Sequence, residues 1–149
     1  MRAVLQRVHQ ARVKVESREI GSISHGMLVF LGVASDDTEE DLSLLSSKLI
    51  KFRIFADKDN KMNLSIRDTG GSMLIISQFT LFGTWRKGNR PGFFKAASPE
   101  KGETYYNHFI DLIKKQGIPV STGTFGANMN VELSNDGPVT FFLDTRNPE

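Results

Sequence analysis

The chain has no cysteine among its 149 residues, and this absence removes several kinds of chemistry at once. Structural disulfides, thiolate zinc sites, iron–sulfur ligation and a cysteine nucleophile all require the missing thiol. A cytoplasmic location is compatible with this composition, because disulfides are rare in reducing compartments. The length predicts one domain over residues 1–149, since single folds commonly run to about 100–150 residues.

Long hydrophobic runs are also missing. Arg2 and Arg7 interrupt the start of the chain, which therefore lacks the apolar core of a signal peptide. The longest nearly apolar stretch, residues 26–34, is about half as long as a membrane-spanning helix, and Asp36 and Asp37 follow it. We expect a soluble protein without a membrane span.

Metal-binding side chains are scarce. His9, His25 and His108 lie far apart in the sequence, with no pair at the spacing of a helical or hairpin ligand site. No glycine-rich phosphate loop with its lysine is present, and Gly70-Gly71 favours a turn. The sequence therefore predicts neither a metal nor a cofactor.

Neither sign of charge dominates, since the chain has 19 Lys and Arg residues and 17 Asp and Glu residues. Its distribution is uneven, because residues 1–15 and 69–99 carry basic residues and no acidic one. The second segment holds the basic and aromatic residues Trp85, Arg86, Lys87, Arg90, Phe93, Phe94 and Lys95. Such a composition suits an RNA backbone with a stacked base, and a solvated loop has the same composition, so both interpretations stay open.

Strand patterns are the most frequent signal along the chain. Residues 2–8, the alternating pair Val13 and Val15, and the apolar run 27–33 predict three strands of an antiparallel sheet. Residues 53–55 predict a short strand before a polar turn at 56–61. The run 73–82 begins as a buried strand and becomes polar near its end, at Ser77, Gln78 and Thr80.

The last third of the chain predicts two more strands, at residues 129–133 and 139–143. Between them stands Asn135-Asp136-Gly137-Pro138, whose turn residues predict a hairpin. A second interpretation is a turn whose main-chain carbonyls face a ligand.

Two helices separate these groups of strands. The first follows Ser35-Asp36-Asp37, which we expect to supply its N-cap, and carries Leu42, Leu45, Leu49 and Phe52 at helical spacing. The second begins at Ser98-Pro99-Glu100 and ends before Gly117 and Pro119. This order predicts an α+β fold, with an antiparallel-rich, barrel-like core and two main helices.

Ser77 and Thr80 are candidate nucleophiles, because a hydroxyl at the end of a buried strand is a common place for one. A nucleophilic hydroxyl needs a base within hydrogen-bond reach, and no His, Asp or Glu stands near them in the sequence. Gln78 suits either a structural amide or a group that orients a carbonyl.

Several segments taken together resemble the D-aminoacyl-tRNA deacylase family, whose members remove wrongly attached D-amino acids from tRNA. The matching residues are 1–8, 31–33, 61–65 and 123–127, with the two motifs Ser77-Gln78-Phe79-Thr80-Leu81 and Asn135-Asp136-Gly137-Pro138-Val139-Thr140. The two motifs in this order and at this separation are strongly specific, and the resemblance covers essentially the whole chain.

The resemblance implies an enzyme that hydrolyses the ester bond of D-aminoacyl-tRNA, and also of glycyl-tRNA mischarged on tRNA-Ala. It implies a homodimer in which a cis Gly137–Pro138 bond enters the active site of the partner subunit. The terminal aminoacyl-adenosine then lies beside Ser77, Gln78, Phe79 and Thr80. The carbonyls of Gly137 and Pro138 occupy the space that an L side chain needs.

Further roles follow from the same resemblance. Arg7 and Asn135 support the Gly–Pro turn, and Phe125 and Met129 line the pocket. Arg86, Lys87 and Arg90 become candidate tRNA contacts. Where the family often has a serine, this chain has Gly92, which removes a side-chain contact there.

For the mechanism we expect the substrate's own ribose 2′-hydroxyl to assist attack by water, with the Phe79 and Thr80 N–H groups stabilising the oxyanion. Thr80 then positions the substrate, and no metal takes part. Two other functions stay open: a small-ester hydrolase that uses Thr80 or Ser77 as nucleophile, and a tRNA-binding module without catalysis.

Overall fold

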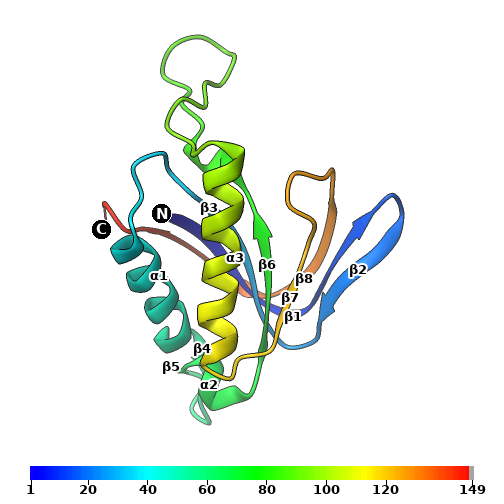
Figure 1. The fold of residues 1–149 in the computed structure, drawn as a ribbon. Coiled ribbons are helices and arrows are strands. Elements are labelled where there is room, and N and C mark those ends of the chain that lie inside the picture. The colour runs from blue at the N-terminus through cyan, green and yellow to red at the C-terminus, as the bar shows by residue number, and fades with distance from the viewer. Residues whose placement is uncertain (148–149) are drawn as a thin grey trace.

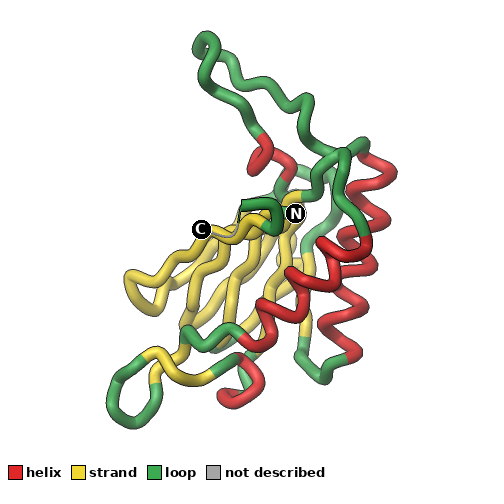
Figure 2. Tube along the Cα trace, turned by 90° about the vertical axis from the view of Figure 1, so that its left-hand side faces the viewer, coloured by secondary structure: helices red, strands yellow, loops and turns green. Residues whose placement is uncertain are grey.

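A six-stranded sheet forms the centre of the computed structural model, which describes residues 1–147, and helices α1 and α3 cover one of its faces (Figures 1 and 2). In chain order the elements are β1 (Arg2–Val15), β2 (Arg18–Ile23), β3 (Gly26–Gly32), α1 (Glu39–Lys51), β4 (Phe55–Ala56), β5 (Met62–Leu64), α2 (Ile66–Thr69), β6 (Ser72–Ser77), the 3-10 helix η1 (Phe79–Phe82), α3 (Pro99–Lys115), β7 (Val120–Thr122) and β8 (Asn130–Asp144). None of the described helices is both long and apolar enough to span a membrane.

The strands form a mixed sheet. β1 pairs antiparallel with β2, β3 and β8, whereas β3–β6 and β6–β7 are parallel. The strand order is β2-β1-β3-β6-β7, with β8 also paired to β1. Ser121 Oγ in β7, at one end of this order, donates to the Ser22 carbonyl in β2, at the other end, at 2.9 Å, so the sheet nearly closes on itself. The expected α+β fold is therefore confirmed. Its barrel-like core is a mixed sheet, in which β1 makes the antiparallel pairings and β6 makes the parallel ones.

Hydrophobic cores lie on both faces of the sheet. Along β3, Met27, Val29 and Leu31 belong to the core beneath α1 and α3, while Leu28 belongs to a second core with Val8. Successive side chains of a strand point to opposite faces, so a strand buried on both faces is apolar without interruption. This explains the apolar run at residues 26–34.

The two main helices were predicted, but the start of the first was placed too early. Thr38 is the N-cap of α1 and forms a capping box with Asp41. Asp37 is buried instead, where it accepts hydrogen bonds from the Met1 amino group at 2.7 Å and from the Ala34 N–H at 2.6 Å. For α3 the prediction is confirmed, because Ser98 is the N-cap and Pro99 follows it.

The predicted hairpin around Gly137 is wrong. β8 continues as one strand beside β1, where Gln6 pairs with Thr140 and Val8 pairs with Asn135. Between these pairs a single residue of β1, Arg7, lies opposite four of β8, so residues 136–139 bulge out of the ladder. The Asn135 side chain closes this bulge, since its Nδ2 donates to the Val139 carbonyl at 3.0 Å and its Oδ1 accepts from the Val139 N–H at 3.2 Å.

Other boundaries also differ from the expectation. The strands predicted at residues 2–8 and 13–15 are one long strand, β1, and the strand predicted at 53–55 is β4, at Phe55–Ala56. β2, β7 and the short helix α2 were not predicted. β2 is mostly exposed and carries few apolar residues, so it gives almost no periodic signal.

Candidate active site

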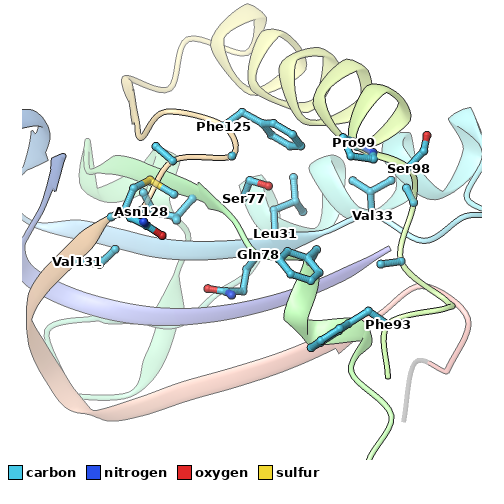
Figure 3. A pocket seen from close by; sticks show the side chains of 18 residues that line it. Leu31, Val33, Ser77, Gln78, Phe93, Ser98, Pro99, Phe125, Asn128 and Val131 are labelled. Atoms are coloured by element: carbon cyan, nitrogen blue, oxygen red, sulfur yellow. The ribbon is translucent and has the colours of Figure 1, made fainter. Parts of the chain in front are cut away.

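A cavity of about 610 Å³ lies at the carboxyl ends of the parallel strands β3 and β6, beside the first turn of α3. Figure 3 shows Phe125 and Pro99 on the α3 side of this space and Ser77 and Leu31 on the sheet side. The cavity is lined by Leu31, Val33, Ile76, Ser77, Gln78, Phe79, Phe93, Ala96, Ala97, Ser98, Pro99, Gly102, Phe125, Gly126, Ala127, Asn128, Met129 and Val131. A volume of this size suits a small organic ligand.

The end of β6 is fixed by its neighbour β3. Ser77 pairs with Leu31, and the next N–H group, that of Gln78, donates to the Leu31 carbonyl at 2.8 Å. The chain then turns into η1, so Phe79 and Thr80 leave the sheet at the mouth of the cavity. The first half of the run 73–82 is the buried strand β6, and the polar residues Ser77 and Gln78 at its end line the cavity.

Thr80 is exposed, and its hydroxyl is hydrogen-bonded to the side chain of Gln78. Gln78 Nε2 donates to Thr80 Oγ1 at 2.5 Å. Phe79 is also exposed and packs edge to face against Phe93, with ring centroids 5.0 Å apart. Of the four residues predicted to be catalytic, Ser77, Gln78 and Phe79 line the cavity and Thr80 lies just outside it.

Among residues 1–147, no side chain that lines the cavity is a His, Asp, Glu, Lys or Arg. Among the hydrogen bonds of residues 1–147, none joins Ser77 or Thr80 to an imidazole or a carboxylate. A hydroxyl nucleophile requires such a base within reach. The described residues also contain no group of three His, Asp or Glu able to hold a metal ion.

Besides the side chains of Ser77, Gln78 and Asn128, the site offers main-chain N–H groups as donors. In a 3-10 helix the first N–H groups have no acceptor within the helix. Around η1, over the described chain, the N–H groups of Gln78, Leu81 and Gly83 are bonded to main-chain carbonyls, which leaves those of Phe79 and Thr80 for another acceptor. Two adjacent N–H donors at the mouth of a cavity can stabilise an oxyanion.

The far wall of the cavity comes from the segment before β8. Phe125 packs against Tyr106 at 5.9 Å between ring centroids, and a Cβ at Gly102 would lie 3.3 Å from the Phe125 ring. Met129 lies beside Gly123, which has no room for a side chain next to the Met129 sulfur. Both predicted lining residues, Phe125 and Met129, are therefore in the cavity wall.

The contribution of α3 was not predicted from the sequence. Ser98, Pro99 and Gly102 come from its N-terminal end and line the cavity. A glycine inside an amphipathic helix costs stability, so Gly102 was the available signal for a close contact. Tyr106, one turn later, is buried and donates to the Ile75 carbonyl of β6 at 2.7 Å, and burial raises the pKa of its hydroxyl to about 12.

Gly137 and Pro138 lie away from this cavity within the same chain. Both are exposed on the bulge of β8, and the peptide bond between them is cis. Arg7 is close to them, because its Nε donates to the Asp136 carbonyl at 2.9 Å and its Nη1 to the Ile54 carbonyl at 2.7 Å. Asn135 Nδ2 also donates to the main-chain carbonyl of Arg7 at 3.0 Å.

The candidate RNA contacts lie on the long loop between η1 and α3, which rises above the rest of the molecule at the top of Figure 1. Arg86, Lys87 and Arg90 are all exposed there. Thr84 and Gly92 pair across the base of the loop, where a Cβ at Gly92 would lie 2.9 Å from Thr84 Oγ1. The absence of a side chain at Gly92 therefore fits the threonine opposite.

A family model and two similar proteins carry deacylase descriptions. The model of the D-Tyr-tRNA(Tyr) deacylase family matches residues 4–144. A D-aminoacyl-tRNA deacylase of Thermotoga petrophila is 52% identical over 145 residues, 97% of each chain. One of Geobacter sulfurreducens is 53% identical over 146 residues, 98% of this chain and 96% of its own.

Two solved structures share the fold. One, titled c-Myc DNA Unwinding Element Binding Protein, has a TM-score of 0.92 and 39% identity, and the match covers 97% of this chain and 98% of its own. The other, titled as a probable eukaryotic D-amino acid tRNA deacylase, has a TM-score of 0.84 at 20% identity over 95% of this chain and 97% of its own.

Proposed function

This chain belongs to the D-Tyr-tRNA(Tyr) deacylase family, and from that premise we propose how it acts as a D-aminoacyl-tRNA deacylase. Water adds to the carbonyl carbon of the aminoacyl ester, the bond to the terminal ribose oxygen breaks, and a free D-amino acid and tRNA leave. The observation that carries the proposal is the cavity at the end of β6. Ser77 and Gln78 line it, and the N–H groups of the next two residues, Phe79 and Thr80, have no main-chain acceptor among the described residues. The expected cytoplasmic location stays a prediction.

The 3′-terminal aminoacyl-adenosine is the part of the substrate that enters this cavity. Its walls are mostly apolar, with Leu31, Val33, Phe125 and Met129 among them. Polar groups gather at the end of β6, so the ester lies there, at Ser77 and η1. The ester carbonyl oxygen accepts from the Phe79 and Thr80 N–H groups as negative charge develops on it.

Among the described side chains that line the cavity, none is a base that could take the proton lost by the attacking water. The ribose 2′-hydroxyl of the substrate stands next to the ester and is held there by the bound nucleoside. An internal group held in position can replace a protein base at high effective concentration. Thr80 positions the substrate, and its hydroxyl does not attack.

A homodimer completes the site. Gly137 and Pro138 lie on the surface, outside their own chain's cavity, which supports their insertion into the partner's. Their fixed carbonyl oxygens then exclude an L side chain by clash and by loss of hydration, with no pocket needed for each D side chain. Glycine has no side chain to exclude, so glycyl-tRNA, including glycine mischarged on tRNA-Ala, is hydrolysed as well.

Comparing D-Tyr-tRNA with L-Tyr-tRNA tests this function directly. The purified protein is expected to hydrolyse D-Tyr-tRNA and Gly-tRNA and to leave L-Tyr-tRNA intact. Equal hydrolysis of the D and L esters, or none of either, would overturn the proposal. Mass measurement of the native complex in the same buffer tests the dimer, and a monomer at full activity would remove the shared site.

A further inference from the structure

The loop between η1 and α3 exposes two large aromatic side chains. Trp85 is 78% exposed and Phe94 is 76% exposed, more than any other large hydrophobic residue described in the chain. A soluble protein gains nothing in stability from aromatic rings in water. Their exposure together in one loop marks a surface that binds something.

The charge around these two rings is positive. A second cavity, of about 760 Å³, lies under the loop and is lined by Arg2, Phe82, Gly83, Thr84, Trp85, Arg86, Lys87, Arg90, Gly92, Phe94 and Lys95. No acidic residue of the described part of the chain lines it, and none stands in the sequence between residues 69 and 99. Within the described residues, 1–147, no carboxylate forms an ion pair with Arg86, Lys87 or Arg90. The surface therefore suits a polyanion.

This basic and aromatic surface adjoins the active-site cavity. Phe93 lines the active-site cavity, and the next residue, Phe94, lines the second cavity. Phe93 also packs against Phe79 of η1 at 5.0 Å between ring centroids, so the base of the loop is held against the catalytic turn. A strand of RNA that leaves the active site past Phe93 meets Phe94 and Trp85 next.

We propose that Trp85 and Phe94, with Arg86, Lys87 and Arg90, bind the single-stranded nucleotides that precede the terminal adenosine of the tRNA. The inference rests on the proposed function, since it assigns the terminal adenosine to the adjoining cavity. It identifies the ligand as an unpaired strand. Bases in a duplex are stacked on each other and offer no free face, whereas unpaired bases stack on aromatic side chains while cations contact their phosphates.

Trp85 is the single tryptophan of the chain and reports binding directly. The probe is an uncharged RNA hairpin with a short single-stranded 3′ end that terminates in adenosine, and the control is the same hairpin with a blunt end. The overhang is expected to quench Trp85 fluorescence, and the blunt hairpin is expected not to. Equal quenching by both RNAs, or none by either, would overturn the stacking assignment.

A kinetic comparison separates this surface from the chemistry. Two substrates are used: D-Tyr-tRNA and the 3′-D-tyrosyl ester of adenosine alone. The ratio of kcat/KM for the tRNA to that for the nucleoside ester is expected to fall about ten-fold in Trp85→Ala and to recover in Trp85→Phe. An unchanged ratio in Trp85→Ala would contradict the proposal, as would a failure of Trp85→Phe to restore it.

The cations are tested through salt. Replacing Arg86, Lys87 and Arg90 by alanine is expected to make RNA binding less salt-dependent, by about 0.7 in the logarithmic slope for each phosphate group that is no longer neutralised. Lys115→Ala is the control, because Lys115 ends α3 and lies about 20 Å along the helix from Gly102, which lines the active-site cavity. An equal salt slope in the triple variant and the control would rule out binding of phosphates by these three cations.

These outcomes distinguish the surface from the proposed function. If neither substrate is hydrolysed, the deacylase proposal fails, while the fluorescence measurement still tests RNA binding because it uses uncharged RNA. If both substrates are hydrolysed and Trp85 is not quenched, the function stands and the surface assignment fails.

Discussion

The Gln78 side chain donates a hydrogen bond to the hydroxyl of Thr80, with Nε2 and Oγ1 2.5 Å apart. A hydroxyl that attacks a carbonyl must pass its proton to a base, and the amide of Gln78 is not a base. The hydrogen bond from Gln78 holds the Thr80 side chain in place. This arrangement suits a residue that positions a substrate oxygen and does not suit a nucleophile.

Thr80→Ala is expected to keep measurable activity on D-Tyr-tRNA, at about one tenth of the parent rate, because the main-chain N–H groups remain. A substrate whose terminal ribose lacks the 2′-hydroxyl is expected to react more slowly still, by about 100-fold or beyond, with the unchanged enzyme. Single-turnover rates measure both. Thr80→Ser, which keeps the hydroxyl, is the control and is expected to retain most of the activity.

The competing mechanism makes the opposite prediction. If Thr80 were the nucleophile, Thr80→Ala would abolish hydrolysis, and a covalent aminoacyl-enzyme could be trapped by acid quench and found by mass spectrometry. Either result would return Thr80 to the catalytic role and make the protein a conventional ester hydrolase.

Arg7 links the bulge of β8 to the turn after α1. Its guanidinium donates to the carbonyls of Asp136 and Ile54, and Nε lies 3.1 Å from the Asp136 carboxylate. Lysine cannot form this fork of donors, so Arg7→Lys is expected to loosen the bulge at a cost of about 1–3 kcal/mol in the free energy of unfolding. Urea unfolding measures this cost.

The same variant tests the link between Arg7 and the chirality of the substrate. We expect hydrolysis of L-Tyr-tRNA to rise relative to D-Tyr-tRNA in Arg7→Lys, because the Gly137 and Pro138 carbonyls are less firmly placed. Arg18→Lys on the exposed strand β2 is the control. Reduced stability with unchanged D-over-L selectivity would confine Arg7 to a structural role.

Gly137 has no space for a side chain. A Cβ there would collide with the main-chain nitrogen of Val139 and would lie 2.8 Å from Asn135 Oδ1, which closes the bulge. Gly137→Ala is expected to shift the bulge and lower D-over-L selectivity about ten-fold or more. Initial rates on both esters give the selectivity, with Ser134→Ala on the same strand as control. A selectivity equal to that of the control would refute the carbonyl filter.

The end of β6 was easier to predict from the sequence than the pairing of the strands. Ser77 and Gln78 stood out because they end an apolar run, and the structure places them at the end of a buried strand beside a cavity. That signal is local, since burial of β6 requires only apolar residues in sequence. The first turn of α3 gave no comparable signal, because its contribution depends on how the helix packs against β6.

The error at Gly137 has a different physical cause. Asn, Asp, Gly and Pro in succession predict a reversal of the chain, and their local preferences are the same in a bulge. Only the pairing partner distinguishes the two, and both halves of β8 pair with β1 because that strand is long enough to hold them. Contacts between residues more than 100 positions apart decided the outcome.

The ends of the chain are joined by a cluster of charged groups that makes stability depend on pH. Arg146 Nη2 donates to Asp41 Oδ2 at 3.0 Å, and Thr145 Oγ1 donates to Asp41 Oδ1 at 2.6 Å while accepting from the Met1 amino group at 2.6 Å. The hydrogen bond from Arg146, followed by those from Thr145 and Thr38, holds the pKa of Asp41 well below its ordinary value although burial opposes it.

The sign of the pH effect follows from this shift. The unfolded chain binds the Asp41 proton at a higher pH than the folded chain does, so the stabilisation is complete above the ordinary carboxyl pKa. It disappears as the pH falls through the lower, folded value. Asp41→Asn is therefore expected to be less stable than the parent at neutral pH, and the difference should shrink between about pH 5 and about pH 2.

Urea unfolding at a series of pH values measures this convergence, because the free energy of unfolding of each variant can be compared at each pH. Asp111→Asn, on the exposed side of α3, is the matched control and is expected to run parallel to the parent. If the Asp41→Asn curve also ran parallel to the parent curve, the link from Asp41 to Arg146 would contribute no pH-dependent stability. Packing and neutral hydrogen bonds alone would then hold residues 145 and 146, which follow β8, against the first turn of α1.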